Sequence, residues 1–103
     1  MSHWTVLKVK LSNPNPGILK TALDVIAREL GSHVVEDYTV TGFGFSERCN
    51  YAIPLNLRYG NGYGVKITST GEVLVVVDDH GAPLSASDFA NKLTQYYLSL
   101  IHI

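Results

Sequence analysis

The segment 51-YAIPLNLRYGNGYGVKI-67 decides the fold, because two strand-like runs lie on either side of a glycine-rich bend. Apolar and polar residues alternate along the first run, as they do in a strand with one buried face. The run after the bend, "YGVKI", has the same period. The sequence therefore predicts an antiparallel hairpin. Its first strand has Tyr51, Ile53, Leu55, Leu57 and Tyr59 facing inward, and Pro54, Asn56 and Arg58 facing outward.

The length of the bend sets the register of this hairpin. A two-residue turn at Asn61-Gly62 would place Arg58 on the apolar face. A three-residue loop over 60–62 places Tyr59 opposite Tyr63 and keeps the apolar side chains together, so we predict this loop. The glycines do not form a dinucleotide-binding fingerprint, because the spacing differs from G-x-G-x-x-G and no helix follows.

The next run, "EVLVVVD" over 72–78, is apolar on both sides, as in a central strand covered on both faces. A two-residue turn at Thr70-Gly71 would place Leu74 and Val76 in the core. A longer loop would place Val73, Val75 and Val77 there instead. The pattern leaves both alternatives open.

The N-terminal half predicts one strand, one helix and a second strand. Alternation over 3–11 places Thr5, Leu7, Val9 and Leu11 on one side. Helical spacing predicts a helix over about 16–30, with Asn15 as its N-cap and Gly31 after its end. A strand is expected over 33–41, and turn or irregular structure over 42–50.

A second helix follows Ser85, which together with Asp88 forms an S-x-x-D helix start. The elements then follow the order β-α-β-β-β-β-α. This order predicts one α+β domain over residues 1–103, a two-layer sandwich with an antiparallel-rich sheet of about five strands and two helices on one face.

The sequence contains more apolar strand residues than two helices can cover on one sheet face. An apolar face left open favours association with another copy or with another protein, and we expect a homo-oligomer, most simply a dimer. The apolar tail "LSLIHI" supports the same expectation. The candidate interface residues are Trp4, Val6, Leu74, Val76, Ile101 and Ile103.

Side chains that could bind a ligand or take part in catalysis are expected at one end of the sheet. Antiparallel pairing places the end of the segment "VLVVVDDH" beside the glycine-rich hairpin. Two carboxylates beside a histidine could hold a divalent metal, bind a small ligand or perform acid–base catalysis. The simpler interpretation of "DDHGAP" is a solvated turn. The candidates are Asp78, Asp79, His80, Arg58 and Tyr63, and no cofactor and no catalytic residue is predicted.

Composition narrows the remaining classes of function. Eight Lys and Arg against nine Asp and Glu give a net charge of −1, which argues against nucleic-acid binding, although Lys8, Lys10 and Lys66 leave the polar sheet face as a minor alternative. No apolar run is long enough to span a membrane. The single Cys49 fits a reducing compartment, so a cytoplasmic location is expected.

Four segments carry a family resemblance: "MSHWTVLKVKL", "NGYGVKI", "EVLVVVDD" and "DFANKLTQYY". Their order resembles the Ycf35-like proteins, a family of unknown function in plastids, cyanobacteria and other microbes. The sequence departs from this family at Gly64, where relatives carry an acidic residue. The resemblance implies the order of the elements and no catalytic residue.

The leading hypothesis is a small, self-associating, non-catalytic interaction or accessory domain. The alternative is a metal-dependent or acid–base enzyme, or a small-ligand binder, at the turn that contains Asp78, Asp79 and His80.

Overall fold

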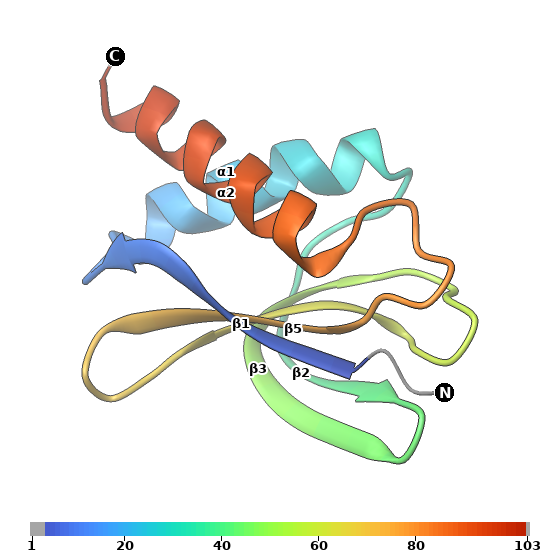
Figure 1. Ribbon diagram of the computed structural model, residues 1–103. Coiled ribbons are helices and arrows are strands. Elements are labelled where there is room, and N and C mark those ends of the chain that lie inside the picture. Colours follow the sequence, from blue (N-terminus) through green and yellow to red (C-terminus); the bar gives the residue numbers. More distant parts are fainter. Residues whose placement is uncertain (1–3, 103) are drawn as a thin grey trace.

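One five-stranded antiparallel sheet and two helices make up the protein in the computed structural model, which describes residues 4–102. The strand order is β1-β5-β4-β3-β2, and both helices lie on the same face of the sheet (Figure 1). The α+β arrangement and the predicted order of the elements are confirmed. The elements are β1 Trp4–Ser12, α1 Pro16–Glu29, β2 Val35–Gly42, β3 Phe45–Pro54, β4 Gly62–Ile67, β5 Glu72–Asp78 and α2 Ala86–Ile101.

Both helices begin at the predicted caps. The side chain of Asn15 accepts a hydrogen bond from the backbone N–H of Ile18, and Ser85 accepts one from the N–H of Asp88. Gly31 follows α1 with a φ of +74°, which is the left-handed conformation that glycine adopts most easily. The helix predictions are confirmed.

The main core lies between the sheet and the helices. Leu7 of β1, Val65 of β4 and Tyr51 of β3 lie in one row with Val75 of β5. The longer of the two loops considered before β5 is the one that forms, because Ile67 pairs with Val73. The helix face of β5 therefore carries Val73, Val75 and Val77, all fully buried.

The predicted register of the β3–β4 hairpin is wrong. Ile53 pairs with Tyr63, and β3 ends at Pro54, which cannot donate a ladder hydrogen bond. The backbone N–H of Leu55 then donates to the carbonyl of Asn61, and that of Leu57 to the carbonyl of Gly60, so the chain reverses at residues 58–59. The shift is an even number of residues, so Tyr51, Ile53, Leu55 and Leu57 stay on the predicted face. The inward position predicted for Tyr59 is wrong, because Tyr59 lies in the turn and packs on Phe43 outside the main core. A proline in a strand indicates an edge position or a bulge, whereas β3 lies inside the sheet and accommodates Pro54 at its last residue.

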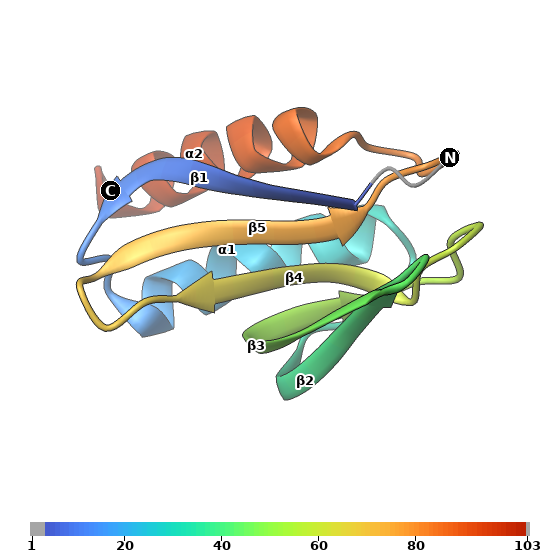
Figure 2. The same cartoon turned by 60° about the horizontal axis from the view of Figure 1, so that its bottom comes forward.

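The segment predicted as turn or irregular structure, 42–50, contains the predicted turn at residues 43–44, but its remainder from Phe45 is the first half of β3. Together with β2 it makes a long hairpin that curls under the face of the sheet opposite the helices (Figures 1 and 2). The curl brings Val40 and Cys49 against Val76 and Ala52 in a second buried cluster. The β2–β3 hairpin therefore covers much of the sheet face opposite the helices, which we call the reverse face.

Two glycines allow the hairpin to approach the sheet. A Cβ atom at Gly64 would lie 2.5 Å from the Sγ of Cys49 and 2.7 Å from a methyl carbon of Val40. A Cβ atom at Gly42 would lie 2.6 Å from the Trp4 ring. Real Cβ contacts are longer, so any side chain at these positions would push the hairpin away from the sheet.

This covering changes the expected interface. Val76 is fully buried inside the chain and is not available to a partner, while Trp4 and Leu74 are half-buried. Val6 and Ile101 are exposed. Ile103 lies outside the described residues. The expectation that the reverse face as a whole lies open is therefore wrong, because the β2–β3 hairpin covers part of it.

Candidate functional site

Aromatic side chains gather where the β2–β3 turn, the β3–β4 loop and the start of β1 meet. The ring of Trp4 stacks on that of Phe45 with centroids 5.6 Å apart, and Phe43 meets Tyr59 edge to face at 5.3 Å. Val6 follows Trp4 on the same face of β1. We call Trp4, Val6, Phe43, Phe45 and Tyr59 the aromatic patch.

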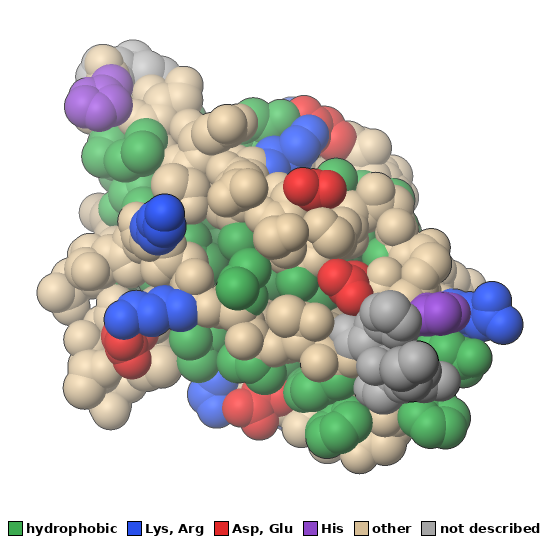
Figure 3. Space-filling model, viewed as in Figure 1, with side chains coloured by type: hydrophobic (Ala, Val, Ile, Leu, Met, Phe, Trp, Pro, Cys, Tyr) green, Lys and Arg blue, Asp and Glu red, His purple; other side chains and the backbone are tan. Residues whose placement is uncertain are grey.

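The patch is exposed. Phe43 is 60 % exposed, Val6 53 % and Phe45 51 %. Figure 3 shows hydrophobic side chains at this end of the molecule, at lower right, beside a histidine and a basic side chain. Two phenylalanines on one hairpin turn, each more than half exposed, present a large apolar area to solvent.

A buried carboxylate positions the turn that carries Phe43. Asp78 at the end of β5 has no exposed surface, and its Oδ2 atom accepts a hydrogen bond of 3.0 Å from the backbone N–H of Phe43. Its Oδ1 atom accepts a 3.4 Å bond from the N–H of His80. Asp78 therefore ties the hairpin turn to the β5–α2 loop, and both of its oxygens are used in doing so.

Asp79 and Tyr63 also have structural partners. The Oδ2 atom of Asp79 accepts from the N–H of Ala86, the first residue of α2, at 2.7 Å. The hydroxyl of Tyr63 donates to the carbonyl of Leu84 and accepts from the N–H of the same residue. The Tyr63 ring stacks on Phe89 in the core, and burial raises the pKa of its hydroxyl. These contacts fit the simpler interpretation of the turn.

Arg58 and His80 form the polar rim of the aromatic patch. The Arg58 guanidinium lies 5.5 Å from the centroid of the Tyr59 ring, and the His80 ring lies 5.2 Å from the same centroid. Arg58 and His80 thus come together around Tyr59, and Asp78 is joined to this group by its hydrogen bond from the His80 N–H, at the end of the sheet where the antiparallel pairing predicted them. Within residues 4–102, no three or more His, Cys, Asp and Glu side chains are grouped so that they could hold a metal ion.

The lysines of the polar sheet face do not form a free basic surface. Lys8 pairs with Glu72 at 2.6 Å, and Lys66 pairs with Glu47 at 2.8 Å. Each pair neutralises the charge that a phosphate would otherwise contact. Only Lys10 of the three has no ion pair among the described residues.

Cys49 is an inert thiol in this setting. It is buried under the curled hairpin, and burial, with the nearby Glu47 carboxylate, raises its pKa from 9.0 to about 11. The neighbouring Arg48 instead forms an ion pair of 2.7 Å with Asp37, and this hydrogen bond lowers the pKa of that carboxyl. The reactive thiolate is therefore scarce at neutral pH.

Phe43, Phe45 and Tyr59 are not among the site residues that the sequence predicts. The segment "GFGFSERCN" over 42–50 has the pattern of a turn or irregular structure, although it contains two phenylalanines. A turn on a soluble domain is ordinarily polar, so two phenylalanines around one glycine were a usable signal.

The chain matches no family model, no curated protein and no solved structure. Neither helix among residues 4–102 has both the length and the apolar character needed to cross a membrane.

Proposed function

We propose that the protein is a small non-catalytic interaction domain that forms a homodimer through the aromatic patch. The observation that carries the proposal is the exposure of Phe43 and Phe45 on one short turn. Aromatic residues are enriched at the centres of protein interfaces, and each large apolar side chain that becomes buried contributes about 1.5–3 kcal/mol.

Preorganisation of the patch supports the proposal. Asp78 holds the backbone of Phe43, and Trp4 stacks on Phe45, so the two exposed rings are already ordered before a partner arrives. Ordering side chains costs free energy on association, and a prearranged patch has less of that cost. The net charge of −1 gives two copies little long-range repulsion.

Other parts of the proposal rest on the sequence alone. A cytoplasmic location is supported by the single free cysteine, and membership of the Ycf35-like proteins by the four short segments quoted above. Neither adds an activity. The enzyme alternative has no supporting observation, because Asp78 and Asp79 both bind backbone N–H groups.

The test is sedimentation velocity over a range of concentrations up to the high micromolar. We expect the wild-type chain to sediment as a dimer and the double variant Phe43→Ser, Phe45→Ser to sediment as a monomer. Leu98→Ser is the matched control, because Leu98 is also 40 % exposed but lies on α2, away from the patch. It should remain a dimer.

A wild-type chain that is strictly monomeric at these concentrations would overturn the proposal. So would a double variant that dimerises as well as the wild type while its circular dichroism shows a native fold.

A further inference from the structure

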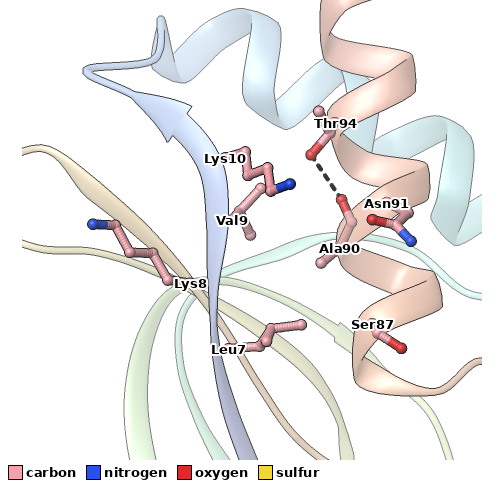
Figure 4. A pocket seen from close by; sticks show the side chains of 8 residues that line it. All are labelled: Leu7, Lys8, Val9, Lys10, Ser87, Ala90, Asn91 and Thr94. Atoms are coloured by element: carbon pink, nitrogen blue, oxygen red, sulfur yellow. Dashed lines mark hydrogen bonds between the residues drawn. The ribbon is translucent and has the colours of Figure 1, made fainter.

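The free edge of β1 has a groove beside it. Among residues 4–102, β1 is the first strand in the sheet order and its partner strand is β5, so from Val6 onward alternate backbone N–H and C=O groups along its other side have no strand partner within the described chain. Helix α2 runs next to this edge and leaves a groove of about 240 Å³ (Figure 4). A groove between an edge strand and a helix has the shape that an extended peptide needs to add as a further strand.

The groove is lined by apolar side chains of β1 and α2 and by polar side chains of α2. Leu7 and Val9 of β1 and Ala90 of α2 supply the apolar part. Ser87, Asn91 and Thr94 supply the polar part, at spacings of four and three residues that place them on one side of α2. This combination suits the alternating side chains of an extended segment.

The groove carries a positive charge that no residue of the described chain neutralises. Lys8 and Lys10 are the charged residues that line it, and no Asp or Glu does. Lys8 points away from α2 and pairs with Glu72, whereas Lys10 extends toward α2 (Figure 4). The side chain of Lys10 forms no hydrogen bond or ion pair with residues 4–102.

The local backbone explains why the two lysines point apart. Residues two apart on a regular strand share a face. The register of β1 against β5 shifts between Val9 and Ser12, and Lys10 lies inside this irregularity. Bulges of this kind re-aim side chains at strand edges. Here the irregularity turns Lys10 into the groove.

The same side of α2 continues beyond the groove with exposed apolar residues. Leu98 and Ile101 follow Thr94 at spacings of four and three residues, and are 40 % and 44 % exposed. A segment that runs along β1 past Lys10 would find apolar contacts there.

We propose that this groove binds an extended acidic peptide segment of a partner protein. The segment adds as a strand to the free edge of β1, one of its carboxylates pairs with Lys10, and its apolar side chains pack on Leu7, Val9 and Ala90. This site lies on a different surface from the aromatic patch and does not depend on the proposed homodimer.

A second copy of this chain is a poorer occupant. Its own β1 edge carries Lys8 and Lys10 and no Asp or Glu, so it offers Lys10 no carboxylate. Its other edge is β2, where the acidic residues are Glu36 and Asp37. Asp37 is already paired with Arg48, and its φ of +53° interrupts the regular strand at that point. An extended partner segment with unpaired carboxylates fits Lys10 better.

Fluorescence anisotropy with a labelled nonapeptide of alternating glutamate and valine tests the proposal. The control peptides replace every glutamate with lysine, or the central valine with proline, which cannot donate a strand hydrogen bond. We expect binding of the acidic peptide only. Lys10→Glu should weaken that binding on the order of tenfold or more, whereas Lys20→Glu, the same charge change on α1, should leave it unchanged.

A steric pair of variants provides a second readout. Asn91→Trp fills the groove and should abolish peptide binding, whereas Gln95→Trp places the same ring on an exposed part of α2 that does not line the groove. Equal binding of acidic and basic peptides, no binding of either, or an unchanged affinity in Lys10→Glu would overturn the proposal. A self-assembly that Asn91→Trp converts to monomers would also overturn it, because a second copy would then occupy the groove.

Discussion

Cys49 lies where the curled hairpin crosses β4, and its sulfur fills the space above Gly64. The position explains both its burial and the rise of its pKa to about 11. Since the folded state holds the thiol proton more tightly than the unfolded state, folding and protonation of Cys49 are linked.

The raised pKa of Cys49 predicts that the free energy of unfolding falls at alkaline pH. The contribution of the protonated thiol is complete below pH 9 and is lost as the pH rises from 9 to 11, because the unfolded chain then binds fewer protons than the folded one. The free energy of unfolding should fall by at most about 2 kcal/mol from this group. Urea unfolding of the wild type and of Cys49→Ala at pH 8, 9, 10 and 11 measures it.

The comparison of the two proteins isolates the thiol, because lysines and tyrosines titrate in both. We expect the stability advantage of the wild type to shrink across this interval. An advantage that stays constant would show that Cys49 has an ordinary pKa.

Asn61 shows where residue preferences mislead. Asn-Gly pairs are the commonest signal for a tight hairpin turn, but here the pair is used for a tertiary contact. The Oδ1 atom of Asn61 accepts from the N–H of Thr41 at 2.8 Å, and its Nδ2 donates to the carbonyl of Thr39. The side chain thus joins the β3–β4 loop to β2. No local pattern reveals a partner 20 residues away.

At the scale of elements, the β2–β3 hairpin is the part that the sequence predicts least well. The alternation of apolar and polar residues predicts a strand near β2 and the second half of β3. The helix caps Asn15 and Ser85, with helical spacing, predict both helices. The curl was not predictable from alternation, because a strand that bends over its own sheet buries residues from both of its faces. Val40 and Cys49 therefore look like isolated apolar residues in the sequence, although both are buried.

The curl predicts that Gly64→Ala destabilises the protein by about 1–3 kcal/mol, because the added methyl group overlaps the Cys49 sulfur and the Val40 methyl group. The midpoint of urea unfolding measures the loss. The reaction of Cys49 with a thiol reagent under native conditions should also become faster as the hairpin is pushed away.

Gly17→Ala is the matched control. Gly17 lies in the first turn of α1, where an added Cβ would lie 3.3 Å from the Oδ1 atom of Asn15, the helix cap, a contact that is 0.8 Å longer than the 2.5 Å contact at Gly64. We expect a change of less than about 1 kcal/mol there. Equal effects at the two glycines would mean that the close approach at Gly64 does not limit stability.

At the scale of the whole molecule, a partly buried hydrogen bond joins α2 to the cap of α1, 82 residues apart in the sequence. The hydroxyl of Tyr97 on α2 accepts from the backbone N–H of Asn15, the cap of α1, at 2.9 Å. Tyr97 is buried, so the loss of its oxygen leaves that N–H poorly solvated. Tyr97→Phe should lower the free energy of unfolding by about 1 kcal/mol, measured by urea unfolding.

Tyr96→Phe is the control, because it shows whether the loss of any tyrosine hydroxyl from α2 lowers the free energy of unfolding. The hydroxyl of Tyr96 donates to the carboxylate of Glu29 at 2.6 Å on the exposed side of the helix pair. Because water replaces this contact readily, Tyr96→Phe should change stability by less than about 0.5 kcal/mol. The reverse ranking of the two variants would contradict the assigned roles.

The candidate site was predictable in its location but not in its composition. Antiparallel pairing placed Arg58, Asp78 and His80 at one end of the sheet. It did not show that Asp78 would be buried under the β2–β3 turn, because that contact depends on the curl. The exposed rings of Phe43 and Phe45, rather than the carboxylates, are what this end presents to solvent.

The strand order also sets the sequence of events during synthesis. β1 leaves the ribosome before the other elements described here, yet its neighbour in the sheet of residues 4–102 is β5, and α2 follows later still. The strands from β2 to β5 can pair as successive hairpins while they emerge. Leu7, Val9 and Leu11 have no apolar cover until β5 and α2 have emerged, so we expect β1 to remain unpaired and accessible to chaperones during the synthesis of the elements between them.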